Sequence, residues 1–253
     1  MAIARRPRPA PGAALSDDDI HQRLVEAIVD QRLVPGTRLG EDKLGQAFGV
    51  SRTRIRQVLI RLAQEQVVTL QPNKGASIAE PSVDEAREVF EARSVVESVL
   101  VRRFIQRATA SDLKALADCI DQEEAARRSG DAAMALRQSG RFHLLLADAA
   151  GHQTFASFLR RLVSRTSLIL MSYAPAEDAR VAGPRWIQVC RCEEHRGLLT
   201  ALRQASRGRA EEKVREAVAL MTEHLAHIEG SLCFDSDALP ELDLLQTLAQ
   251  GGR

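Results

Sequence analysis

The sequence predicts a mainly α protein with two domains. Over residues 16–80, three short helical patterns precede two β-branched segments separated by a glycine turn, and residues 83–234 then show only helical periodicity. Helix, helix-turn-helix and hairpin in this order are typical of a winged helix-turn-helix. We therefore expect an N-terminal winged helix-turn-helix with a small β-hairpin wing, followed by a C-terminal all-α bundle of six helices.

The N-terminal domain is expected at residues 16–80, after a flexible basic tail at 1–15. Its helices are expected at about 20–31, 41–48 and 51–64, and its strands at 67–70 and 76–79. The first helix has N-caps available in the aspartates at 17–19, and the third has Ser51. Pro72-Asn73-Lys74-Gly75 supplies the turn between the strands.

The C-terminal domain is expected at residues 83–236, after a boundary at Glu80-Pro81-Ser82, and residues 237–253 form a loose tail. Its amphipathic helices are expected at about 83–107, 110–129, 131–150, 152–173, 185–204 and 209–234. Glycine and proline breaks separate them, the last at Ser206-Arg207-Gly208.

The composition fits a globular, cytoplasmic protein. Hydrophobic residues make up 45% of the chain and charged residues 27%, and no apolar run approaches the roughly 20 residues of a membrane span. The N-terminus lacks the apolar segment of a secretory signal. Cysteines at 119, 190, 192 and 233 suggest reduced thiols, and the isolated C-x-C pair gives no support for a zinc knuckle.

Positive charge is concentrated around the third helix. Between Phe48 and Lys74 there are five basic residues and a single acidic one, Glu65. This excess of positive charge suits either a polyanionic partner or an ordinary solvated helix face. The start of a recognition helix meets base edges in the major groove, where arginine reads guanine, while hydroxyl groups and the wing meet phosphates. The candidate DNA contacts are Ser51, Arg52, Thr53, Arg54, Arg56, Lys74 and Gly75.

The run LVPGTRLGEDKLGQAFGVSRTRIRQVLIRLAQEQVVTLQPNKGASIAEP resembles the DNA-binding domain of the GntR family over about residues 18–80. The resemblance implies DNA contacts from Ser51, Arg52, Thr53, Arg56 and the wing glycine Gly75. Two positions depart from the family pattern. Arg54 replaces a common proline, which adds a candidate contact, and Asp42 replaces an arginine that reads the operator in many relatives, with Lys43 beside it as a substitute.

Three histidines are expected to face the interior of the bundle from three different helices. His143, His195 and His224 each share a helical face with apolar residues, whereas His152 and His227 are expected at the periphery, and His21 has no assigned role. A single buried histidine is usually a satisfied core residue. Three that converge would favour a zinc- or nickel-type ion, but helical periodicity does not show whether they converge.

The C-terminal half resembles the FCD effector domain of the FadR branch, through EVFEARSVVE, FHLLLADAAGH, EEHRGLLTAL and MTEHLAHIE; six helices would favour the VanR-type subgroup. The resemblance implies a divalent metal held by an aspartate and three histidines. Those histidines carry over to His143, His195 and His224, but Ser139 stands where the aspartate is expected. Either a three-histidine site completed by water or an effector carboxylate, or a pocket without metal, fits this pattern.

Arg93 is the candidate effector anchor. In similar domains this arginine points into the effector cavity, and the two parallel N–H groups of a guanidinium suit a carboxylate. The alternative is a surface pair with Glu97, one helical turn away. The leading hypothesis is a homodimeric repressor that binds operator DNA and a small carboxylate metabolite, and is not an enzyme. A metal sensor is the alternative. A metal-dependent hydrolase is a remote one, because Glu193 and Glu194 beside His195 are expected to point elsewhere and supply no general base.

Overall fold

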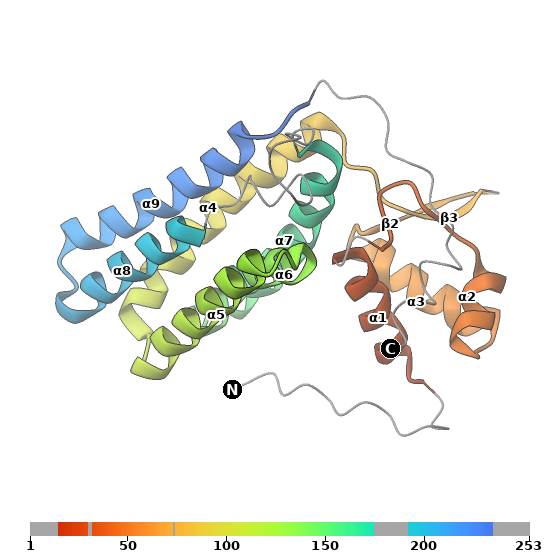
Figure 1. Ribbon diagram of the computed structural model, residues 1–253, viewed down its shortest axis with the longest axis horizontal. Coiled ribbons are helices and arrows are strands. Elements are labelled where there is room, and N and C mark those ends of the chain that lie inside the picture. Colours follow the sequence, from red (N-terminus) through yellow and green to blue (C-terminus); the bar gives the residue numbers. More distant parts are fainter. Residues whose placement is uncertain (1–14, 30–31, 73, 175–191, 235–253) are drawn as a thin grey trace.

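A computed structural model describes residues 15–29, 32–72, 74–174 and 192–234. The chain forms a winged helix-turn-helix head and a six-helix bundle within these residues (Figure 1). The head consists of α1 (Asp17–Val29), β1 (Arg38–Leu39), α2 (Glu41–Phe48), α3 (Arg52–Gln64), β2 (Val68–Gln71) and β3 (Gly75–Ile78). The bundle consists of α4 (Val83–Arg107), α5 (Ala110–Arg128), α6 (Ala132–Ala150), α7 (Gln153–Tyr173), α8 (Cys192–Gly208) and α9 (Glu211–Gly230). Among the helices that the structure describes, none has the length and the apolar character of a membrane-spanning segment.

The head differs from the expectation at the start of α1. Ser16 Oγ accepts a hydrogen bond from the Asp19 backbone N–H (3.1 Å), and the Asp19 carboxylate accepts one from the Ser16 backbone N–H (2.9 Å). The predicted aspartate N-cap is therefore wrong, because Ser16 caps the helix and Asp19 completes a capping box. The released Asp17 and Asp18 carboxylates pair with arginines of α3 instead.

The wing contains one more strand than the sequence predicts. β1 pairs with β3, and β3 with β2, all antiparallel, so the sheet order is β1-β3-β2. β1 has only two residues and therefore shows no alternating pattern in the sequence. At the tip of the wing Gly75 has φ +83°, a left-handed conformation that favours glycine. Asn73 lies outside the described residues.

The bundle follows the predicted helices closely, with one correction near its end. Ser206, Arg207 and Gly208 belong to α8, so the predicted break at these residues is wrong. The chain turns at Arg209 instead, where φ is +51°. The predicted start of that helix, at 185–191, lies outside the described residues.

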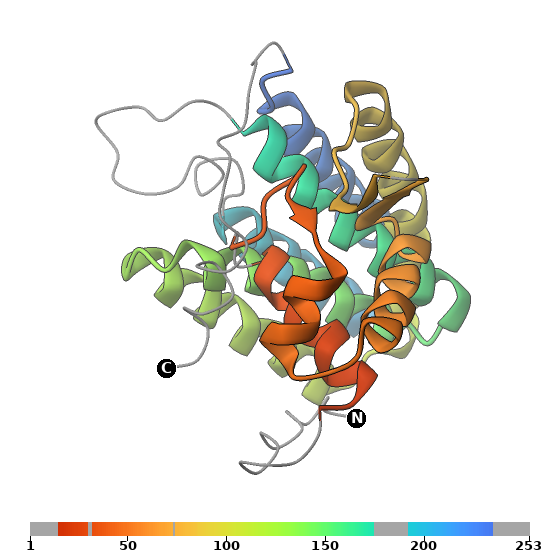
Figure 2. The same ribbon diagram turned by 90° about the vertical axis from the view of Figure 1, so that its right-hand side faces the viewer.

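The head packs against one end of the bundle (Figure 2), where α1 contacts both α6 and α7. Leu168 of α7 is fully buried and belongs to the apolar core of the head. Arg165 lies about one helical turn before Leu168 on α7 and is 6% exposed. It donates from Nη1 to the Gln66 carbonyl (2.5 Å) and from Nε to the Glu85 carboxylate (2.5 Å). Tyr173 Oη donates to the Pro81 carbonyl between the domains (2.6 Å). Through these contacts α7 links the interior of the bundle to the head.

Candidate functional site

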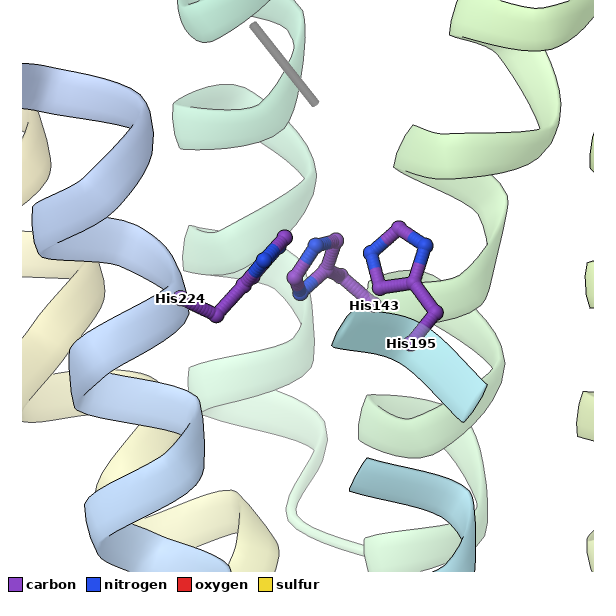
Figure 3. A group of neighbouring side chains, drawn as sticks. All are labelled: His143, His195 and His224. Atoms are coloured by element: carbon purple, nitrogen blue, oxygen red, sulfur yellow. The ribbon is translucent and has the colours of Figure 1, made fainter. Parts of the chain in front are cut away.

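Three histidine rings converge in the centre of the bundle (Figure 3). His143 comes from α6, His195 from α8 and His224 from α9, and none of them is more than 2% exposed. One ring nitrogen from each lies within 4.8 Å of the other two. The expectation that these three side chains point inward is confirmed, and the fold supplies the convergence that periodicity cannot show.

Each histidine is held from behind by a glutamate. Nδ1 of His143 lies 2.5 Å from Glu97, Nδ1 of His195 lies 2.7 Å from Glu123, and Nδ1 of His224 lies 2.7 Å from Glu194. An ionised carboxylate only accepts hydrogen bonds, so each Nδ1 carries the proton and donates it. In a neutral ring Nε2 then keeps a free lone pair. The Nε2 atoms of His195 and His224 are buried and have no hydrogen-bond partner among the described residues.

The charges of this cluster are set by burial and by neighbouring groups. Burial alone would raise the pKa of Glu97, but Arg93 and His143 outweigh it and lower that pKa to about 2. Burial lowers the pKa of His143 to about 4 and that of His224 to about 3, even though their glutamates favour the charged rings. The carboxylates are therefore ionised and these two rings neutral near pH 7, which is the state that binds a metal ion.

The glutamates were not foreseen from the sequence. Glu194 was expected to point away from His195, and it does lie off that ring, but it contacts His224 of the next helix. Glu123 and Glu97 are fully buried charged residues on helical faces that are mostly apolar. A buried charge requires a partner, so a glutamate at a buried helical position predicts a cationic or hydrogen-bonding group beside it.

Arg93 lies next to this cluster and is buried at 3% exposure. Its Nε donates to Glu97 (2.7 Å) and its Nη1 to Thr166 on α7 (3.3 Å). The pair with Glu97 exists, but in the interior and not on the helix surface. Arg93 Nη2 is buried without a hydrogen-bond partner in the described chain. Ser139, the residue in place of the expected aspartate, is buried one helical turn before His143.

The candidate DNA-reading residues are exposed at the start of α3 and at the wing, except for Arg54, which is half-buried. Ser51 caps α3 by accepting a hydrogen bond from the Arg54 backbone N–H (3.4 Å), which places Arg52 and Thr53 in its first turn. Arg52 and Arg56 project into solvent, with 62% and 61% of their side chains exposed. Lys74 and Gly75 are exposed at the wing.

The arginines of α3 are paired with carboxylates from α1 and α2. Arg56 binds Glu41 through Nε and Nη2 (2.8 and 2.9 Å), and Arg52 contacts Asp42 and the same Glu41 (3.1 and 3.4 Å). The hydrogen bond from Arg56 lowers the pKa of Glu41. Arg54 binds Asp17 (2.8 Å) and the Leu15 carbonyl (2.6 Å), so it fastens the start of α1 to α3.

A hollow of about 420 Å³ lies apart from the histidine cluster. It is formed where the end of α4 meets the start of α9, and Arg102 and Glu211 in its wall form an ion pair at 3.3 Å. No histidine of the cluster lines it, so it does not mark the candidate metal centre.

Two protein families match the two domains. "Bacterial regulatory proteins, gntR family" matches residues 17–78, and "FCD domain" matches residues 88–227. The matches coincide with the head and with most of the bundle.

Curated relatives and solved structures agree with these matches. The chain is 24% identical over 217 residues to "HTH-type transcriptional repressor RspR" of Escherichia coli K12, covering 85% of this chain and 88% of that protein. It is 30% identical over 132 residues to "Nta operon transcriptional regulator" of Aminobacter aminovorans, covering 52% and 62%. The structure of E. coli McbR/YncC superposes with a TM-score of 0.68 at 20% identity, covering 85% of this chain and 98% of that one. A GntR regulator from Rhodococcus sp. RHA1 gives 0.65 at 23% identity, covering 85% and 95%. These structures share the fold.

Proposed function

Because the chain belongs to the GntR family of bacterial regulatory proteins and carries an FCD domain, we propose that it is a ligand-controlled, sequence-specific transcriptional repressor. The head binds operator DNA, and the bundle binds a small carboxylate metabolite through a divalent metal ion. The observation that carries the ligand half of this proposal is the convergence of three histidines, each held at Nδ1 by a glutamate.

The residues present fit a zinc- or nickel-type ion. Metal-binding histidines usually donate their second ring N–H to a carboxylate, which fixes the tautomer and orients the ring. His143, His195 and His224 all have this arrangement, and two of the inward nitrogens are buried without a partner. The ion would act as a Lewis acid with a coordination position left for a ligand. The buried glutamates supply the negative charge that Ser139 does not.

An effector with a carboxylate suits the neighbouring Arg93. Its guanidinium is buried, and two of its nitrogens are fixed by Glu97 and Thr166 while Nη2 is not. A buried donor without an acceptor is unfavourable by about 1–3 kcal/mol, and a ligand oxygen would relieve this. We therefore assign Arg93 as the effector anchor.

The path from this site to the head consists of direct contacts. His143 contacts Glu97, Glu97 contacts Arg93, and Arg93 contacts Thr166. The residue next to Thr166 on α7 is Arg165, which binds the Gln66 carbonyl of the head. A ligand that draws Arg93 away from Thr166 would thereby act on the helix on which the head rests. Coupling between two such sites is typically about 1–3 kcal/mol.

A homodimer, working in the cytoplasm, completes the proposal. Operators read by helix-turn-helix proteins have two half-sites, and a two-fold dimer places one recognition helix in each. We assign residues 16–80 to DNA binding and 83–236 to effector binding and dimerisation.

The first experiment measures the metal content of the untagged protein. About one ion per chain is expected, lost in His195→Ala and retained more tightly in Ser139→Asp, because a carboxylate adds a ligand. His152→Ala is the matched control, since His152 caps α7 away from the cluster. A metal-free native protein that loads no zinc or nickel on titration would contradict the metal site.

The second experiment measures DNA binding. A duplex is selected from a random pool with the native protein, and its affinity is titrated with metal and with carboxylates. Release of the duplex by the metal alone would indicate a metal sensor. In a separate assay, hydrolysis of an ester by the native protein that is lost in His143→Ala would indicate a hydrolase. Arg52→Ala is expected to weaken DNA binding about tenfold or more, as for the loss of a base contact. Arg61→Ala, at the far end of α3, is the control and is expected to weaken DNA binding much less.

A further inference from the structure

Arg52 and Arg56 at the start of α3 are each held in a specific orientation. A guanidinium has a side edge, made by Nε and Nη2, and an end edge, made by Nη1 and Nη2. Arg56 gives its side edge to Glu41, with Nε at 2.8 Å and Nη2 at 2.9 Å from the two carboxylate oxygens. Arg52 gives the same edge to two carboxylates, with Nε at 3.1 Å from Asp42 and Nη2 at 3.4 Å from Glu41. Both arginines therefore keep the end edge for another partner.

The position of the carboxylates explains this orientation. Glu41 and Asp42 form the first turn of α2, and the turn after α2 brings Arg52 and Arg56 of α3 beside them. The Glu41 side chain is only 23% exposed, whereas both arginine side chains are more than 60% exposed. The less exposed carboxylate thus holds the two more exposed guanidinium groups.

The remaining edge has the chemistry of guanine recognition. Arginine reads guanine with two parallel hydrogen bonds to O6 and N7 in the major groove. A guanidinium whose side edge is occupied can still make both bonds through its end edge. An unrestrained arginine, in contrast, can turn its side edge to a phosphate and bind any sequence.

We infer that Glu41 and Asp42 are positioning residues that set base specificity, by directing the end edges of Arg56 and Arg52 to guanines and away from phosphates. This inference rests on the proposed DNA binding. These carboxylates oppose non-specific DNA binding, because they add negative charge beside the phosphates. They nevertheless support binding to the selected sequence.

The test compares three full-length variants on two duplexes. The first duplex is the one selected with the native protein, and the second has an unrelated sequence of the same length. Glu41→Gln and Asp42→Asn keep the shape of the side chain and remove its charge. Asp18→Asn is the matched control, because Asp18 also pairs with an arginine of α3, but with Arg61 at the other end of the helix.

Glu41→Gln is expected to bind the unrelated duplex about twofold more tightly, because one repelling charge is gone. The same variant is expected to bind the selected duplex about tenfold less tightly, as for the loss of one oriented base contact. Asp42→Asn is expected to act in the same directions with a smaller change, because Asp42 pairs with Arg52, whereas Glu41 pairs with both Arg52 and Arg56. Asp18→Asn is expected to leave the ratio between the two duplexes unchanged.

A modified base separates positioning from general weakening. Replacing the contacted guanines by 7-deazaguanine removes the N7 acceptor, which is expected to weaken the native protein strongly and Glu41→Gln much less. Equal weakening of both duplexes, or an undiminished 7-deazaguanine penalty in Glu41→Gln, would overturn the inference while leaving DNA binding intact. Failure of the native protein to select any duplex would overturn both.

Discussion

In both the bundle and the head, carboxylates orient neighbouring side chains, but those of the bundle lie in the interior and those of the head near solvent. In the bundle, the carboxylates Glu97, Glu123 and Glu194 hold histidine rings, and two of these carboxylates are fully buried. In the head, Glu41 and Asp42 hold arginines whose side chains are more than 60% exposed. Both sets of carboxylates orient a group for which a further partner is proposed, a metal ion for the histidines and DNA for the arginines.

Solvent exposure decides what each pair contributes. A buried ion pair is expensive to break, because the remaining charge is left without water or a partner. An exposed pair is screened by water and contributes about 0–1 kcal/mol. The pairs in the bundle are therefore expected to combine stability with the proposed positioning of a ligand, whereas those in the head are expected to contribute almost only orientation. Free energies of unfolding and DNA affinities should separate the two roles.

The largest effect is expected from Glu97→Ala in the metal-free protein. Glu97 accepts hydrogen bonds from both Arg93 and His143, so its loss leaves a buried guanidinium without its carboxylate. The free energy of unfolding, measured in urea, is expected to fall by about 3–5 kcal/mol. Glu91→Ala, an exposed position on the same helix, serves as the control. A loss of similar size in both variants would show that the buried pair has no special role.

The stability of the metal-free protein is expected to depend on pH through the buried rings. Burial lowers the pKa of His143 to about 4 and of His224 to about 3 from 6.5, so between pH 6.5 and 4 the unfolded chain binds more protons than the folded one. Unfolding therefore becomes easier as the pH falls from 7 to 5, by about 1–2 kcal/mol for each ring. Urea unfolding of the native protein and of His224→Gln checks this.

The variant should lose part of the pH dependence. A pH dependence that is the same in both proteins would contradict the neutral, buried state of His224.

An intermediate effect is expected at the junction between the two regions. Arg165→Lys keeps the charge but loses the planar fork that reaches both Gln66 and Glu85. We expect a loss of about 1–2 kcal/mol in the free energy of unfolding, with faster amide exchange around Gln66 by mass spectrometry. Arg161→Lys, exposed on the same helix, is the control. Unchanged exchange around Gln66 would remove Arg165 from the path between ligand and head.

The sequence predicted whatever depends on the period of a single helix. The inward faces of His143, His195 and His224 follow from the apolar residues at helical spacing around them, and the order of the helices follows from the breaks. What a side chain contacts on another helix does not follow. Glu123 contacts a ring 72 residues later and Arg54 an aspartate 37 residues earlier. The strand β1 was missed because two residues are too few to show a period.

The smallest effect on stability, and the sharpest contrast with the bundle, is expected at Glu41 and Asp42 in the first turn of α2. Glu41→Gln and Asp42→Asn remove pairs that are largely exposed, and their free energies of unfolding should stay within about 0.5 kcal/mol of the native protein. The same variants are expected to change the ratio of specific to non-specific DNA binding, because orientation and not stability is what these carboxylates supply. Urea unfolding beside the duplex titrations checks both statements on one preparation. A stability loss as large as that of Glu97→Ala would mean that Glu41 is part of the head's structural core, and any loss of DNA discrimination would then follow from a loosened α3.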